Sequence, residues 1–215
     1  MSYDYKKTIN AEKAAIFRIV HRDNIAWMLD HGLHCRNSDV FDPNYVEIGN
    51  PDLIGKRNAR EIDHPPGGTL SDYVPFYFTP FSPMLYNIHT GYGGIRKRTN
   101  EEILLIASSL HHLRALEVPF LFTDRHAYLE FAQFTSDLAR LDWIDWPSLQ
   151  ARDFKRGDPV KFDRYQAEAL VHGVLPVEGI RGIACYNEPM ANHLRQMLAQ
   201  RNLTIPVAAQ PTWYF

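Results

Sequence analysis

Glu168 is the residue whose chemical type and surroundings most suggest catalysis. It lies within Tyr165–Val171 (Y-Q-A-E-A-L-V), an otherwise apolar run that predicts a β-strand. A carboxylate in such a strand either faces solvent or lines a site, where burial and a cationic partner set its pKa. The strand pattern alone leaves both interpretations open.

Residues 71–86 could supply a flat surface for a ring. These sixteen residues include six aromatic side chains and three prolines. Because proline fixes φ and lacks an amide hydrogen, we expect a stiff, irregular wall instead of an ordinary strand or helix. Aromatic faces stack on bases or on nicotinamide at little entropic cost. Basic residues flank this segment on both sides: Lys56, Arg57, Arg60, Arg96, Lys97 and Arg98. Their presence favours a binding site for a planar, phosphorylated ligand. The alternative is an aromatic core segment whose neighbouring charges are merely solvated.

A second basic stretch comes directly before Glu168. Five cations alternate there with aromatic residues: Arg152, Lys155, Arg156, Lys161 and Arg164 with Phe154, Phe162 and Tyr165. Such alternation suits a sequence-tolerant grip on single-stranded nucleic acid, although a charged run is more often a solvated surface.

The tetrapeptide at residues 21–24, His-Arg-Asp-Asn, falls where a predicted first strand meets a helix. Backbone donors at a helix start, beside a histidine and an arginine, can bind an anion or an amide, and ordinary helix capping is equally compatible. His31, His34 and Cys35 lack the spacing and the second pair of a zinc site, so we expect no metal. The sequence also contains no nucleophile-elbow, P-loop or Rossmann glycine motif.

Composition limits the class of protein. With 215 residues, 45% hydrophobic and 22% charged, the chain fits one globular domain, residues 1–215. A net charge of −2 means that any nucleic-acid contact must come from local patches. Two distant cysteines, no signal-peptide core and no membrane-length apolar run predict a cytoplasmic protein without membrane contact, and nothing indicates more than a monomer.

The predicted elements follow an α+β order. We expect strands at 15–21, 102–107, 119–122, 165–171, 180–186 and 204–208. We expect helices at 25–30, around 53–59, at 125–141 with Ala127, Phe131 and Phe134 on its buried face, and from Asn187 to about 200. Residues 36–72 otherwise predict a long loop, of which 36–56 could cover a ligand, and residues 142–163 a loop with one helical turn.

In order, these segments resemble the DarT family of DNA ADP-ribosyltransferase toxins. The matching stretches are H-R-D-N-I-A-W-M-L-D-H-G at 21–32, residues 53–60, G-G-T-L-S-D-Y-V-P-F-Y-F-T-P-F-S-P-M-L-Y at 67–86, F-T-D-R-H-A at 122–127 and Y-Q-A-E-A-L-V at 165–171. The resemblance implies a split-β-sheet ADP-ribosyltransferase fold with two small mixed sheets and flanking helices. It also implies NAD⁺ as co-substrate and a base of single-stranded DNA, thymine or guanine, as acceptor.

The resemblance also assigns roles to residues. Glu168 and Arg57 match the catalytic pair, and Lys56 and Arg60 are the alternative positions for its basic member. A glutamate that holds the ribose 2′-hydroxyl would favour the positive charge that develops as the glycosidic bond breaks. The implied NAD⁺ contacts are His21, Arg22, Asn24, Tyr77, Ser82 and Met84, and the implied DNA contacts are Arg60, Arg98, His126, Phe154, Lys155, Lys161 and Arg164.

One position departs from the family pattern. Phe81 stands where many relatives have arginine, and this exchange could change which base enters the pocket.

The resemblance further implies a cognate antitoxin that removes ADP-ribose from DNA. Two alternatives remain: a hydrolase or N-glycosidase that pairs Glu168 with Asp72 or Asp124, and a non-catalytic single-strand-binding module.

Overall fold

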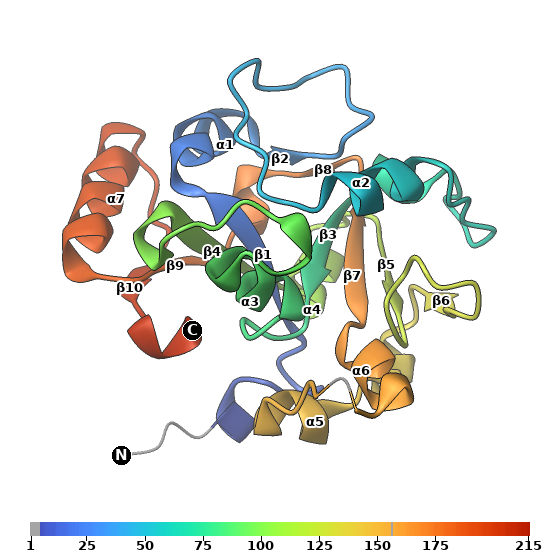
Figure 1. Ribbon diagram of the computed structural model, residues 1–215. Coiled ribbons are helices and arrows are strands. Elements are labelled where there is room, and N and C mark those ends of the chain that lie inside the picture. Colours follow the sequence, from blue (N-terminus) through green and yellow to red (C-terminus); the bar gives the residue numbers. More distant parts are fainter. Residues whose placement is uncertain (1–4, 156) are drawn as a thin grey trace.

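The computed structural model describes residues 5–155 and 157–215, so the expectation for Arg156 lies outside the described residues. The strands are β1 (Ala15–His21), β2 (Leu33–His34), β3 (Tyr73–Tyr77), β4 (Ile103–Ser109), β5 (Phe120–Thr123), β6 (Phe134–Thr135), β7 (Glu168–His172), β8 (Val174–Leu175), β9 (Gly182–Cys185) and β10 (Val207–Ala209). The helices are α1 (Ile25–His31), α2 (Pro51–Asn58), α3 (Pro83–Thr90), α4 (Leu110–Ala115), α5 (Trp146–Ala151), α6 (Pro159–Tyr165) and α7 (Glu188–Gln200). Figure 1 shows the connection between β2 and α2 at one end of the molecule, with α5 and α6 at the other.

The main sheet has the strand order β10-β9-β4-β1-β3-β7-β5-β6, and β2 pairs with β8 in a second sheet. All neighbours are antiparallel except β9 and β10. β1 and β3 share a single pair, Phe17 with Tyr77, whereas β1 pairs with β4 along its whole length and β3 pairs likewise with β7. The expected split sheet is therefore confirmed, but its halves meet at one pair and form one eight-stranded sheet in place of two small ones.

Pro75 explains where the sheet splits. Continuing the Phe17–Tyr77 register by two residues would place Ile19 opposite Pro75, and no pairing is present there. Proline has no amide hydrogen to donate to a neighbouring strand. The Pro75 carbonyl instead accepts a 2.9 Å hydrogen bond from Nη1 of Arg18. A side chain thus enters the gap between the two strands.

β9, β4 and β1 are buried on both faces, which accounts for their nearly continuous apolar sequences. Alternate residues face opposite sides, since Ile19 and Leu105 pack with Leu85 and Ile88 of α3. Residues 16, 20, 104 and 106 pack on the other side with Leu194 and other residues of α7. This sandwich fixes β1 and α3, two walls of the cavity described below.

The aromatic segment at residues 71–86 contradicts the expectation of an irregular wall. It contains β3 and the first turn of α3, joined by a short connection. Pro75 is tolerated in β3 because its nitrogen needs no partner at the split. Pro83 occupies the first turn of α3, where helices accept proline, and Ser82 caps the helix by accepting from the Leu85 amide at 3.2 Å.

The helix expected at residues 125–141 was also wrong. Turns, the short strand β6 and a 3-10 helix at Leu138–Trp143 occupy this range. Oδ1 of Asp124 accepts from the Gln133 amide at 3.0 Å, so it closes a loop instead of capping a helix. Pairing of β6 with β5 holds the far end. Phe131, expected on a buried helix face, is 78% exposed.

The other differences are smaller. The strand expected from Tyr165 begins at Glu168, because α6 continues to Tyr165. The region 142–163 contains two short helices, α5 and α6, where one turn was expected. β1, α1, α2 and α7 lie within a few residues of their predicted bounds. Across the described residues, none of the helices has the length and apolar character needed to cross a membrane.

Candidate active site

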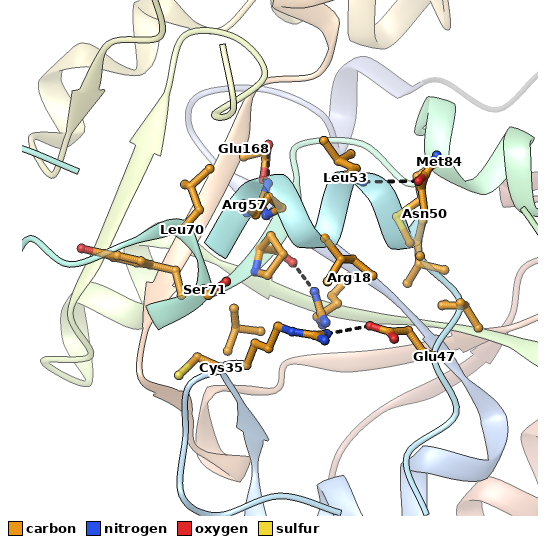
Figure 2. A pocket seen from close by; sticks show the side chains of 18 of the residues that line it. Arg18, Cys35, Glu47, Asn50, Leu53, Arg57, Leu70, Ser71, Met84 and Glu168 are labelled. Atoms are coloured by element: carbon orange, nitrogen blue, oxygen red, sulfur yellow. Dashed lines mark hydrogen bonds and ion pairs between the residues drawn. The ribbon is translucent and has the colours of Figure 1, made fainter. Parts of the chain in front are cut away.

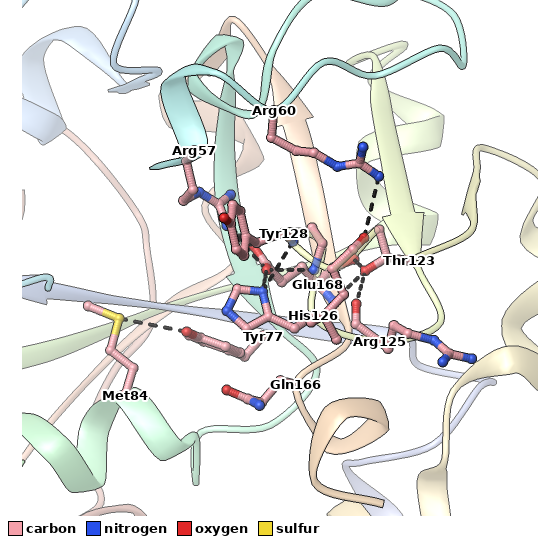
Figure 3. Close-up of polar contacts among 12 residues, drawn as sticks. Arg57, Arg60, Tyr77, Met84, Thr123, Arg125, His126, Tyr128, Gln166 and Glu168 are labelled. Atoms are coloured by element: carbon pink, nitrogen blue, oxygen red, sulfur yellow. Dashed lines mark hydrogen bonds and ion pairs between the residues drawn. The ribbon is translucent and has the colours of Figure 1, made fainter. Parts of the chain in front are cut away.

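Glu168 is the first residue of β7 and lies at the split, where β7 pairs with β3. The residue as a whole is 3% exposed. The Glu168 amide donates to Oγ1 of Thr123 at 3.0 Å, which fixes the start of the strand. Oε1 accepts from the Ala127 amide at 3.0 Å and lies 2.9 Å from Nδ1 of His126 (Figure 3). A proton on that nitrogen makes the second contact a hydrogen bond to the carboxylate.

Arg57 is brought to Glu168 by α2. Asn50 caps this helix by accepting from the amides of Asp52 and Leu53, and the last turn presents Arg57. Nη1 of Arg57 donates to Oε1 and Oε2 of Glu168, at 3.2 and 2.9 Å. Nη2 of Arg57 is buried and has no hydrogen-bond partner among the described residues. A buried donor without a partner is costly, so this atom offers a bond to a ligand.

Burial and charge act in opposite directions on Glu168. Burial by itself would raise the pKa, because the carboxylate loses its hydration. The charges and hydrogen bonds of Arg57, His126 and the Ala127 amide outweigh it and lower the pKa from 4.5 to about 2. Burial, with the nearby Glu168 charge, raises the pKa of Tyr77 well above its ordinary value. At neutral pH the site therefore holds an ionised carboxylate beside a neutral phenol.

A cavity of about 170 Å³ opens at this pair. Its lining comes from β1, β3, β7, α2, α3 and the connection that precedes α2, and Figure 2 shows side chains converging on it from these elements. Tyr77 and Met84 form one wall, where the Tyr77 hydroxyl lies 3.7 Å from the Met84 sulfur. The combination of an aromatic wall, an ionised carboxylate and an unpaired guanidinium nitrogen fits a cationic ring linked to a sugar.

A second cavity of about 380 Å³ adjoins the first. The two share five lining residues: Arg18, His34, Cys35, Arg36 and Glu47. Arg18 and Arg36 bring positive charge to this junction, although Arg36 also pairs with Glu47 at 2.8 Å. The sequence analysis missed Arg18. A lone cation inside the apolar strand A-I-F-R-I-V-H is the same signal that drew attention to Glu168, and it could have identified this residue.

The predicted NAD⁺ contacts divide into two groups. Tyr77 and Met84 line the first cavity, whereas Ser82 is fully buried as the cap of α3 and lies outside both linings. Asn24 is buried and exchanges two hydrogen bonds with the Val46 backbone, at 3.0 and 2.8 Å. It therefore anchors the connection 36–50, whose end lines the cavity.

His21 and Arg22 also lie outside the linings of both cavities. His21 is buried, with its Nε2 3.6 Å from Oε1 of Glu102, and Arg22 is exposed beside Asp23. Arg98, a predicted DNA contact, donates to the same Glu102 oxygen at 3.0 Å. The Thr99 amide, with Arg98 and His21, lowers the pKa of Glu102 to about 2 despite partial burial. His21 and Arg98 thus meet at one carboxylate.

The remaining predicted DNA contacts are dispersed. His126 lies at Glu168, and Nη2 of Arg60 donates to the carbonyls of Leu129 and Glu130 at 3.4 and 3.3 Å. The Phe154 ring packs with three other rings, those of Tyr86, Tyr165 and Phe215.

In the stretch before β7, Lys155 is exposed, Lys161 pairs with Asp153, and Arg164 donates to the Trp143 carbonyl at 3.2 Å.

Phe81, the residue that departs from the family pattern, is fully buried. Its ring lies 3.7 Å from the Arg152 guanidinium carbon, and it lines neither cavity. Phe81 therefore makes no direct contact with either cavity, and its effect on the choice of base stays a prediction. Within the ranges 5–155 and 157–215, no group of three His, Cys, Asp or Glu residues could hold a metal ion.

Comparison with known proteins decides the family. Residues 17–215 match the family model described as "ssDNA thymidine ADP-ribosyltransferase, DarT". The chain belongs to the DarT family. A DNA ADP-ribosyl transferase of Escherichia coli O127:H6 is 56% identical over 217 residues and is covered completely, as is this chain. One from Thermus sp. 2.9 is 35% identical, over 95% of this chain and 97% of the relative.

Solved DarT structures show the same architecture. Thermus sp. 2.9 DarT in complex with ADP-ribosylated single-stranded DNA matches with a TM-score of 0.87 and 34% identity, over 95% of this chain and 97% of that one. The same protein in complex with NAD⁺ matches with a TM-score of 0.84 and 33% identity, over 95% and 98%. The predicted family, fold class and activity are confirmed: this DarT chain is an NAD⁺-dependent DNA ADP-ribosyltransferase.

Proposed function

We propose that Glu168 and Arg57 are the catalytic pair with which this DarT protein transfers ADP-ribose from NAD⁺ to thymine in single-stranded DNA. The observation that carries the proposal is the buried Arg57–Glu168 pair at the mouth of a cavity walled by Tyr77. The family description names thymidine, which favours thymine over guanine.

Glu168 is suited to stabilise a sugar cation. Oε1 already accepts from Arg57, Ala127 and His126, whereas Oε2 accepts from Arg57 alone among the described residues. Oε2 therefore has capacity for the 2′-hydroxyl of the nicotinamide ribose. As the bond between C1′ and nicotinamide breaks, the ribose becomes positively charged, and an adjacent fixed carboxylate stabilises that charge.

The acceptor reaction breaks the bond between C1′ and nicotinamide, which leaves as a neutral molecule, and forms a bond between C1′ and a ring nitrogen of thymine, which releases its proton to water. Nη2 of Arg57 is the unpaired donor at the cavity, and we assign to it the recognition of an oxygen of the substrate. His126 contacts Oε1 of Glu168, the oxygen that also accepts from the Ala127 amide, so we treat His126 as a positioning residue for the carboxylate.

The proposed NAD⁺ site combines direct and indirect contributions. The Tyr77 ring and the Met84 thioether pack against the nicotinamide. The Arg18 guanidinium binds the phosphates where the two cavities meet. Ser82 and Asn24 act by positioning α3 and the connection 36–50. His21 and Arg22 stay predicted contacts with no place in the cavity lining.

The biological setting is also part of the proposal. A transferase that modifies DNA bases blocks their use as template, which fits a toxin and requires an antitoxin that removes ADP-ribose. We propose that residues 1–215 act as one domain and as a monomer, in the cytoplasm, where the DNA substrate is found.

The experiment incubates the protein with NAD⁺ and four single-stranded oligonucleotides, each carrying one base type at its centre in an otherwise identical context, and measures oligonucleotide mass. We expect one added ADP-ribose on the oligonucleotide with central thymine. Addition to guanine alone would overturn the choice of base. Cleaved strands or free bases without added mass would favour a hydrolase instead.

A further inference from the structure

Phe131 has the most exposed large hydrophobic side chain in the described part of the chain, at 78%. The sequence pattern placed it on a buried helix face, and the fold instead turns it outward. Exposing a phenyl ring forgoes the free energy that its burial would contribute. A ring kept on the surface at such a position suggests a partner that covers it during function.

The loop that carries Phe131 is firmly held. Arg60, two residues beyond the end of α2, donates to the Leu129 and Glu130 carbonyls, immediately before Phe131 (Figure 3). The Gln133 amide donates to Asp124 on the other side. The ring is therefore presented by a fixed backbone, which reduces the entropy lost when a ligand stacks on it.

The same loop reaches the catalytic carboxylate. His126 and Ala127, at its start, both contact Oε1 of Glu168. Arg57 contacts that carboxylate from α2, while Arg60 contacts the loop. Phe131 is thus only four residues from Ala127, on a loop whose beginning binds Glu168 and whose middle is tied to the chain just after Arg57.

Two further observations favour a nucleic-acid base as the occupant. Phe154, the aromatic residue expected to stack on DNA, is packed with three other rings. The loop with Phe131 adjoins Arg60, whose guanidinium donates to backbone carbonyls and brings positive charge for phosphates, whereas Arg125 at the start of the loop is paired with Asp124. A stacking ring beside cations is the usual composition of a single-strand-binding surface.

We propose that Phe131 stacks on a base of the DNA strand next to the acceptor base and so holds the strand over Glu168. This proposal rests on the function proposed above. It assigns to the loop 126–133 the contact with the DNA strand, in addition to its contact with the catalytic residue. Stacking depends on a ring and tolerates any base, so Phe131 contributes to DNA affinity more than to the choice of sequence.

The test compares Phe131→Ala with Phe131→Tyr and measures KM for a thymine oligonucleotide and the Kd for NAD⁺ by calorimetry. We expect Phe131→Ala to raise KM for DNA about 10-fold, or about 1.4 kcal/mol, with the NAD⁺ affinity unchanged. Phe131→Tyr retains the ring and should stay within about 2-fold of the wild type. Tyr92→Ala removes another exposed ring, outside both cavity linings, and serves as the matched control.

An unchanged KM for DNA in Phe131→Ala would overturn the proposal. An equal loss in Phe131→Ala and Tyr92→Ala would also overturn it, since the effect would then be general to exposed rings. Weaker NAD⁺ binding by Phe131→Ala would show that the ring maintains the structure of the loop, and it would overturn the proposed contact with DNA. If the wild type modifies no oligonucleotide, the proposed function itself fails, and this outcome is seen before any variant is made.

Discussion

Arg57 donates from one nitrogen to both carboxylate oxygens of Glu168, although the two residues are 111 positions apart in the sequence. Both side chains are largely buried, at 13% and 4% exposure. Removing one member of a buried pair leaves the other charge without compensation, which typically costs about 3–5 kcal/mol. Tests of catalysis should therefore use substitutions that preserve shape, and stability should be measured beside activity.

The pH dependence of stability tests the electrostatics of Glu168. Folding lowers its pKa from 4.5 to about 2, so its stabilising contribution is complete above pH 4.5 and is lost as the pH falls toward 2. The pH-dependent part is on the order of 3 kcal/mol. We expect the difference in unfolding free energy between wild type and Glu168→Gln to be constant from pH 7 to about 4.5 and then to shrink. A difference that already shrinks between pH 7 and 5 would contradict the lowered pKa.

Arg57→Lys separates charge from geometry. Lysine keeps the positive charge but cannot present two parallel donors, one for the carboxylate and one for a ligand. We expect kcat to fall about 100-fold while the protein still folds. Measuring kcat against oligonucleotide and unfolding by heat checks both parts. Lys56→Arg, one residue earlier on α2 and exposed, is the control, and wild-type activity in Arg57→Lys would remove Arg57 from the catalytic pair.

Arg18 should matter for NAD⁺ and not for DNA. Its guanidinium bonds the Pro75 carbonyl in the split and lines both cavities. We expect Arg18→Ala to raise KM for NAD⁺ about 10-fold, because a charge-assisted bond to phosphate is lost. Arg18→Lys should recover part of this loss. A change in KM for DNA alone would show that the junction does not bind the dinucleotide.

The lysines in the basic stretch before β7 should contribute unequally to DNA binding. Lys155 is exposed, whereas Lys161 is paired with Asp153. We therefore expect Lys155→Ala to weaken DNA binding and to reduce the slope of affinity against salt by about 1, and Lys161→Ala to do so less. Fluorescence anisotropy at several salt concentrations measures this slope. Identical slopes for wild type and Lys155→Ala would exclude Lys155 from the DNA contact.

The sequence predicted the elements whose pattern is local. β1 and α7 followed from apolar periodicity and from capping, because these signals involve neighbouring residues only. Pro75 was noticed but misjudged, since its tolerance in β3 depends on a strand that fails to pair, a long-range property. The loop with Phe131 was missed because Asp124 and Arg60 hold it through contacts that no helical spacing reveals.

The residues of the active site also divide into those that the sequence reveals and those whose role depends on the assembled fold. Glu168 and Arg57 were found by residue type together with family resemblance, and the fold brings them into contact. His126 was expected to contact DNA, which stays a prediction; its contact with Glu168 was not expected, because it depends on the pairing of β5 with β7. Arg18 could have been noticed as a lone cation in an apolar strand, but its role at the split between β1 and β3 is defined only by the assembled sheet.

The most direct measurement is the activity of Glu168→Gln, which keeps the shape of the side chain and removes its charge. The assay incubates wild type and variant with NAD⁺ and a thymine oligonucleotide and follows ADP-ribosylated DNA by mass spectrometry, with Glu188→Gln, an exposed glutamate, as control. We predict that Glu168→Gln lowers kcat at least about 100-fold while its Kd for NAD⁺ stays near that of the wild type. Modification of the oligonucleotide at the wild-type rate would contradict the role of Glu168.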